Sequence, residues 1–178
     1  MKARRQRRSL SPLGAVVRGA FAGAVGTAAM DLVWYVRYTR DGGEQSFLAW
    51  EFGESITKWD DVSAPGQVGR RVLEGFLQQE LPDRWARATN NVVHWLYGSM
   101  WGAQYGVVAG SVDREAKPSW GLALAPVVWL SGYVVLPLAK LYKPLWEYDA
   151  ETLMKDFTAH LAYGAATGAA FARLTEPD

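Results

Sequence analysis

Residues 119–139 read SWGLALAPVVWLSGYVVLPLA and carry no charged side chain. An α-helix of this length rises about 30 Å, which is the thickness of the hydrocarbon core of a bilayer. Pro126 and Pro137 interrupt the hydrogen-bond ladder and are expected to kink the helix. The stretch therefore predicts a membrane-spanning helix.

Three further segments have the same character once Gly, Ala and Ser are accepted as membrane residues, namely 13–36, 90–112 and 157–172. Backbone polar groups inside lipid must be satisfied within their own segment, so each segment is expected to be a helix. The sequence predicts an all-α fold, a four-transmembrane-helix bundle with Gly/Ala-rich packing faces. The alternative is a soluble four-helix bundle, which is disfavoured because its small interior could not hide four apolar helices.

Basic residues crowd the beginning of the chain, at Lys2, Arg4, Arg5, Arg7 and Arg8. Such a cluster beside a first apolar helix indicates a cytoplasmic amino terminus, and four spans then return the carboxyl terminus to the cytoplasm. We interpret residues 1–12 as a solvated tail that touches anionic lipid, with no nucleic acid as partner. The first helix is expected to be retained, because Arg18 interrupts the apolar core that a cleavable signal would need.

Residues 37–89 form the one long polar segment and are expected to lie outside the membrane. Apolar residues recur at helical spacing in two parts of this segment, at Val68, Val72 and Phe76 and again between Phe47 and Trp59. The pattern predicts an external helical cap, made of amphipathic helices that lie along the membrane surface or cover the bundle.

The two histidines of the chain begin the same pattern, H-x-x-Y-G-x-x-x-G-x-x-[YF]-[GA]. It reads HWLYGSMWGAQYG at 94–106 and HLAYGAATGAAFA at 160–172. The repetition indicates two helical hairpins of common plan, since internal repeats are frequent in membrane proteins. Chance similarity of composition is the alternative.

Small residues follow one another at intervals of four, and residues four apart share a helix face. Close backbone approach through such faces holds membrane helices together. The predicted helix-packing residues are Gly19, Gly23, Gly98, Gly102, Gly164 and Gly168.

Topology is expected to bring Asp31, His94 and His160 to one depth near the outer leaflet, with Tyr97 and Tyr163 as further hydrogen-bond partners. Polar side chains inside a membrane usually face the bundle interior and have partners. One interpretation is that the cluster only locks the helices together. Another is a proton-responsive switch, since histidine titrates near neutral pH. A third is that His94 and His160 ligate haem, or bind a divalent metal together with Asp31.

Other chemistry has little support in the sequence. The chain contains no phosphate-binding G-x-x-x-x-G-K-[ST], no H-E-x-x-H and no G-x-S-x-G, and we expect no catalytic residues. The carboxylates of WEFGESITKWDD, residues 50–61, are expected to be solvent-exposed. Cysteine is absent, so a thiolate metal site is excluded. We expect no resident cofactor, with haem or a divalent metal as the exceptions described above.

The motifs GAFAGAVGTAAMD at 19–31 and HWLYGxxxGxxY at 94–105 resemble the YagU-like family of small bacterial inner-membrane proteins. The resemblance implies a multi-pass plasma-membrane protein of non-enzymatic type, linked to the envelope and to acid tolerance. The alternatives are a ligand-binding or transport protein for a metal, haem or lipid-like molecule, and an accessory subunit of a larger membrane complex. Beyond the lipid bilayer, the expected partners are a second copy of the chain or such a complex.

Overall fold

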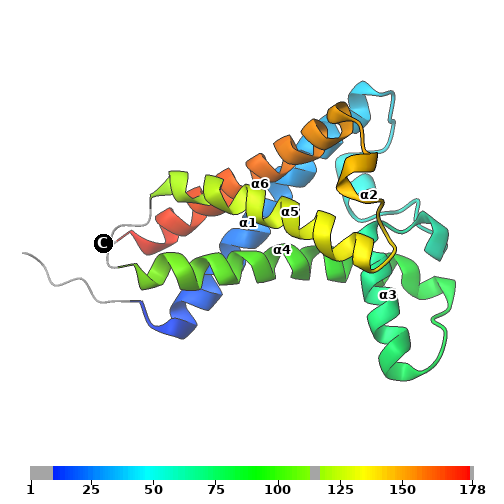
Figure 1. Cartoon of the computed structure of the whole chain (residues 1–178), viewed down its shortest axis with the longest axis horizontal. Helices are drawn as coiled ribbons and strands as arrows, with labels where there is room; N and C mark the ends of the chain where they lie inside the picture. The colour runs from blue at the N-terminus through cyan, green and yellow to red at the C-terminus, as the bar shows by residue number, and fades with distance from the viewer. Residues whose placement is uncertain (1–9, 113–116, 177–178) are drawn as a thin grey trace, which may run out of the picture.

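The computed structural model describes residues 10–112 and 117–176, and within these ranges the chain is helical, with no strand. Figure 1 shows that the long helices cross one another at an angle and that the shorter helices lie at one end of the molecule. The all-α prediction is confirmed. Most of the basic tail predicted for residues 1–12 lies outside the described residues.

The long helices have the following bounds: α1 Pro12–Arg40, α4 Ala86–Ser111, α5 Gly121–Leu138 and α6 Ala150–Thr175. The remaining elements are α2 Phe47–Glu51, α3 Ala64–Leu77 and four short 3₁₀ turns, η1 Trp59–Asp61, η2 Asp83–Trp85, η3 Pro118–Trp120 and η4 Leu145–Glu147. α6 begins well before residue 157 because the side chain of Asp149 accepts a hydrogen bond from the Thr152 backbone N–H at 2.8 Å and so caps the helix.

The helix predicted between Phe47 and Trp59 is much shorter than expected. α2 ends at Glu51, and Gly53 adopts a φ of +58°, a left-handed conformation that glycine tolerates and that turns the chain away from the helix. The apolar spacing over these residues does not mark one helix face, because Leu48 is 64% exposed whereas Ile56 packs against the buried Trp59. The prediction of one continuous amphipathic helix here is wrong.

Two of the four long helical segments, Pro12–Arg40 and Pro118–Leu138, are long and apolar enough to cross a membrane. α4 and α6 are long enough, at 26 residues each, but they do not meet the same criterion of length and composition. Both helices are rich in Gly and Ala and carry the two histidines. By length and composition, two helices could cross a membrane, rather than the four that the sequence predicted.

The packing contacts join the four long helices in the order α4, α1, α6, α5. α1 packs extensively against both α4 and α6, and α6 packs in turn against α5. α4 and α5 make only sparse contact with each other. This arrangement leaves room between α4 and α5 at the end where the short helices gather.

α1 and α4 meet backbone to backbone through glycine. A Cβ atom added at Gly23 would overlap the carbonyl oxygen of Gly98 and would lie 2.8 Å from the Cα of Gly102. A Cβ atom at Gly19 would collide in the same way with the carbonyl of Gly102 and with Gly106. No side chain can be accommodated at these positions, so the predicted packing role of these glycines has a direct steric basis.

The contact between α5 and α6 repeats this arrangement. A Cβ atom at Gly121 would overlap the carbonyl oxygen of Gly164 and would lie 2.7 Å from the Cα of Gly168. Gly164 and Gly168 occupy the same positions after His160 that Gly98 and Gly102 occupy after His94. Within each hairpin, the two helices therefore meet through equivalent glycines, as expected for hairpins of common plan.

Small residues fill much of the interior, beside larger buried side chains that include Tyr163 and Phe171, and many large apolar side chains are exposed. Among the small residues, Ala22, Thr27, Ala125, Ala159 and Thr167 have no exposed surface. Among the large apolar side chains that face outward, Leu96 is 62% and Val108 67% exposed. Other exposed apolar side chains on the long helices are Leu13, Phe21, Leu32, Met100, Val127, Val134 and Leu138. Contiguous exposed apolar surface of this kind is typical of contact with lipid or with another protein.

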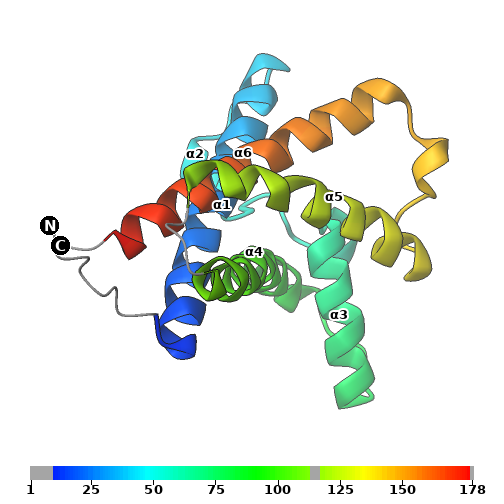
Figure 2. The same ribbon diagram turned by 60° about the vertical axis from the view of Figure 1, so that its left-hand side comes forward.

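α3 runs across the direction of the four long helices, at the end opposite the carboxyl terminus (Figures 1 and 2). Gly66 and Gly69 pack closely on Asn90 and Val93 of α4, which fixes one face of α3. Its other face exposes apolar side chains, with Phe76 84% exposed. An amphipathic helix perpendicular to a bundle has the orientation of a helix that lies in the membrane interface.

Replacing Gly23 with leucine is expected to separate α1 from α4, because the atoms that the new side chain would meet first belong to backbone and cannot move aside. Overpacking of this kind costs roughly 1–3 kcal/mol or more. The free energy of unfolding in detergent should fall by at least that amount. Gly75→Leu is the matched control, because a Cβ atom at Gly75 meets nothing within 4 Å, and equal stability of the two variants would contradict the prediction.

Candidate functional site

Asp31 and His94 form a buried pair between α1 and α4. The Oδ2 of Asp31 lies 2.9 Å from the Nε2 of His94, and the Asp31 side chain is only 7% exposed. A buried carboxylate is tolerated when a hydrogen-bonded partner compensates the loss of water. The sequence analysis placed these two residues at one depth, and in the structure they are in direct contact.

A third titratable residue, Glu51, reaches this pair from the end of α2. α2 is held against α1 by aromatic contacts, in which the Trp50 ring lies 5.5 Å from Tyr35 and 6.0 Å from Tyr38 between centroids. The hydroxyl of Tyr35 also donates to the carbonyl of Gln45 at 3.0 Å. These contacts fix the short helix whose last residue is Glu51.

The turn that follows α2 is fixed from the opposite side by α4. The carbonyl oxygen of Phe52 accepts hydrogen bonds from Arg87 Nε at 2.8 Å and from Asn91 Nδ2 at 3.0 Å. Glu51 is thereby held between α1, which carries Asp31, and α4, which carries His94. The position of its carboxylate depends on backbone contacts that are distant in the sequence.

One ligand atom from each of Asp31, Glu51 and His94 lies within 4.8 Å of the other two. One carboxylate oxygen of Glu51, Oε1, is buried and has no hydrogen-bond partner among the described residues. Burial, followed by the negative charge of Asp31, raises the pKa of Glu51 to about 7. The cluster thus has an unsatisfied acceptor and two carboxylates that repel each other.

Glu51 was missed by the sequence analysis, which expected the carboxylates of residues 50–61 to be solvent-exposed. That expectation is wrong for Glu51, which is partly buried, although it holds for Glu54 and Asp60. The available signal was local: Glu51 follows three apolar residues and precedes a Phe-Gly step. This pattern does not reveal which distant groups the carboxylate meets.

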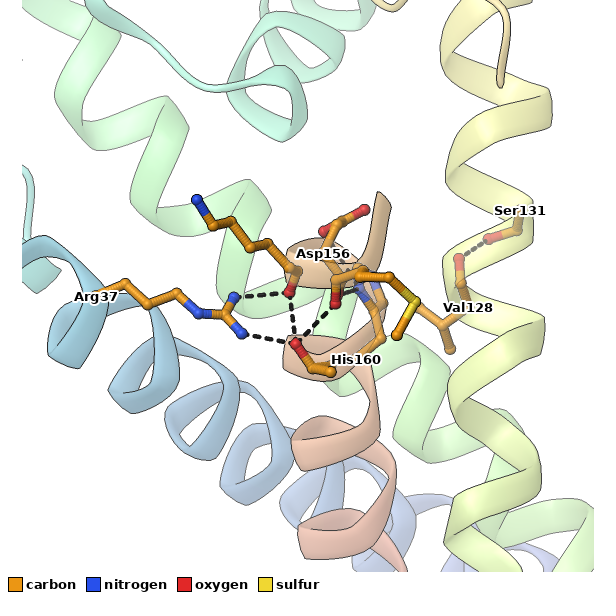
Figure 3. Close-up of polar contacts among 8 residues, drawn as sticks. Arg37, Val128, Ser131, Asp156 and His160 are labelled. Atoms are coloured by element: carbon orange, nitrogen blue, oxygen red, sulfur yellow. Dashed lines mark hydrogen bonds and ion pairs between the residues drawn. The ribbon is translucent and has the colours of Figure 1, made fainter. Parts of the chain in front are cut away.

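His160 makes no hydrogen bond to Asp31. Its Nδ1 lies 2.9 Å from the backbone carbonyl of Asp156 and 3.4 Å from the Asp156 carboxylate, both on α6 (Figure 3). Beside this pair, Arg37 of α1 donates to the carbonyl of Lys155 and to the hydroxyl of Thr158, each at 2.6 Å, as Figure 3 shows. The predicted cluster is therefore divided into two aspartate–histidine pairs.

The division follows from the unequal sequences of the two hairpins. Asp31 lies two helical turns beyond Gly23, and the corresponding residue beyond Gly121 is Trp129. The ring of Trp129 packs on Phe157 of α6, with centroids 5.3 Å apart. Because α5 offers no carboxylate at this position, His160 takes its acidic partner from its own helix.

The two tyrosines predicted near the histidines have other partners. Tyr163 donates its hydroxyl proton to the carbonyl of Gly98 at 2.7 Å and so links α6 to α4. The hydroxyl of Tyr97 lies 3.4 Å from the Oγ of Ser131 on α5. Tyr97 therefore forms one of the few links between α4 and α5.

Two cavities meet at the Asp31–His94 pair. The first has a volume of about 570 Å³ and is lined by Asp31, Glu51 and His94 together with Arg37 and Lys155. The second, of about 350 Å³, lies between α4 and α5 and is lined by both aspartate–histidine pairs. Asp31, His94 and His160 thus all line the second cavity, although His160 makes no hydrogen bond to the Asp31–His94 pair.

The Asp31/Glu51/His94 cluster has the chemistry of a divalent-metal site. One imidazole nitrogen and two carboxylate oxygens suit Zn²⁺, Mn²⁺ or Fe²⁺, and the open cavity leaves coordination positions for water or another ligand. Axial ligation of haem by His94 and His160 stays a prediction.

Comparison of the chain with known proteins finds no matching family model, no similar curated protein and no similar solved structure. The resemblance to the YagU-like family, and the link to acid tolerance that it implies, therefore stay predictions.

Removing the imidazole with His94→Leu is expected to destabilise the protein by about 3–5 kcal/mol, because the buried carboxylate of Asp31 loses its partner. The double variant Asp31→Asn/His94→Leu should recover much of this loss, since it buries no charge. Denaturant unfolding in detergent measures both. Purely additive effects would show that the two side chains are not coupled.

Proposed function

We propose that the protein is a multi-pass integral membrane protein that binds a divalent first-row metal ion at Asp31, Glu51 and His94. The observation that carries the proposal is the approach of three ligand atoms to within 4.8 Å of one another around an unsatisfied carboxylate oxygen. Protein ligands lie about 2.0–2.2 Å from zinc in a tetrahedral site, so neighbouring ligand atoms are roughly 3.4 Å apart. A small movement of Glu51 would complete the site.

Electrostatics favours a cation at this position. Two carboxylates close together in a partly dehydrated site repel each other, and a divalent ion would compensate both charges. Imidazole is a poor ligand for Mg²⁺ and Ca²⁺, so the mixed nitrogen and oxygen ligands favour Zn²⁺, Mn²⁺ or Fe²⁺. The function that these groups support is reversible binding of the ion, in sensing, storage or transfer, rather than a chemical reaction.

The membrane part of the proposal rests on the exposed large apolar side chains, the interior of small residues, and the interfacial orientation of α3. Insertion of α4 and α6 beside the two apolar helices would give the four-span arrangement. Their modest hydropathy is acceptable in a bundle because their glycine faces are covered by α1 and α5. In a bacterial inner membrane, the basic residues near the amino terminus favour a cytoplasmic amino terminus. Four spans would then return the carboxyl terminus to the cytoplasm.

Calorimetric titration of the purified protein in detergent with Zn²⁺ or Mn²⁺ is expected to give one site per chain. Glu51→Gln should weaken binding at least about tenfold, because it removes one charged ligand while α2 keeps its aromatic contacts. Glu54→Gln is the matched control, as this neighbouring carboxylate is exposed. Unchanged binding in Glu51→Gln would overturn the proposed site.

Topology can be tested with single cysteines, because the chain contains none. In intact cells a membrane-impermeant maleimide should label Glu54→Cys in the external segment and should leave Val108→Cys, on the lipid-facing side of α4, unlabelled. Glu176→Cys should react only after the cells are permeabilised. Rapid labelling of Val108→Cys in intact cells would contradict a membrane-spanning α4.

A further inference from the structure

The second cavity, of about 350 Å³, has features of a binding site for a small amphiphilic molecule. Its volume lies within the range of about 300–1,000 Å³ that is typical of ligand sites. It exists because α4 and α5 make little contact, while α1 and α6 close it behind and α3 covers it. Arg71 of α3 reaches the carbonyl of Ala139 just after α5, which fastens this cover across the opening.

His160 defines what the ligand must offer. A backbone carbonyl can only accept a hydrogen bond, so the Nδ1 of His160 that contacts the Asp156 carbonyl carries the proton. The Nε2 of the neutral imidazole is then an acceptor. Since His160 lines the cavity, a bound molecule would satisfy it by donating an O–H group.

Aromatic rings form part of the cavity wall beside aliphatic side chains. The lining includes the side chains of Trp34, Tyr97, Trp129, Tyr133 and Tyr142. Such rings can pack on another flat ring in offset or edge-to-face contact, which adds to the stabilisation from burial alone. Gly132 also lines the cavity, and a Cβ atom there would meet nothing within 4 Å, so the space beside α5 is empty of protein atoms.

We propose that this cavity binds a membrane-soluble hydroxylated aromatic ring, of the quinol class, with one ring hydroxyl donating to His160 Nε2 and the ring held among the aromatic side chains. An apolar substituent would leave between α4 and α5, where outward side chains such as Val134 and Val135 are exposed. The reduced ring is preferred over a ring without O–H groups, because only the former can donate. The inference uses the membrane setting of the proposed function but does not depend on the metal.

Tryptophan fluorescence tests the proposal, since Trp34 and Trp129 line the cavity. Under argon, a decyl-substituted hydroquinone should quench the emission of the purified protein saturably. Its dimethyl ether has the same ring and tail but no O–H donor, and should bind about tenfold more weakly. His160→Leu should abolish this difference by weakening hydroquinone binding to the level of the ether.

Gly132→Leu should abolish saturable quenching by either compound, because the new side chain would occupy the empty space. Gly75→Leu is the matched control, since it introduces the same side chain at an equally open glycine on α3, outside the cavity, and should bind as the unaltered protein does. Equal affinity for the hydroquinone and its ether, or full binding by Gly132→Leu, would overturn the proposal. Loss of metal binding in Glu51→Gln with hydroquinone binding retained would separate this site from the metal site.

Discussion

Contact between the glycine backbones of α1 and α4 is the constraint on which the rest of the structure depends. Close backbone packing of this kind can hold helices together without a hydrophobic drive between them. The contact of Gly23 with Gly98 and Gly102 also fixes the register of two antiparallel helices. Asp31 lies two turns beyond Gly23, and His94 lies one turn before Gly98. With the register fixed, the carboxylate and the imidazole meet at 2.9 Å.

The second hairpin repeats the contact without repeating the site. Tyr105 and Phe171 occupy equivalent positions after the two histidines, and their rings pack on each other with centroids 5.5 Å apart. Equivalent residues that meet in this way are expected of two repeats related by an approximate twofold axis. At the head of the second hairpin Trp129 stands where Asp31 would be, so one hairpin presents a carboxylate and the other an aromatic wall.

The sequence was sufficient for the parts that depend on spacing along one helix. Glycines four residues apart indicated the packing faces, and antiparallel topology indicated that Asp31 and His94 would lie at one level. The partner of His160 was also within reach, because Asp156 precedes it by four residues and therefore shares its helix face. Glu51 was not predictable in this way, since its position depends on the Gly53 turn and on hydrogen bonds from Arg87 and Asn91 to Phe52.

The length of the connection between α1 and α4 is explained by what it adds to the first hairpin. The connection between α5 and α6 spans only residues 139–149, and it brings Tyr142 to the second cavity but no ligand to the Asp31–His94 pair. Residues 41–85, between α1 and α4, contain two helices with separate roles. α2 carries Glu51, and α3 covers the second cavity. A bare repeat would have left a buried aspartate–histidine pair that only joins two helices. The longer connection adds a second carboxylate to that pair, and placing two like charges together costs energy. A bound cation would offset this cost by compensating both charges.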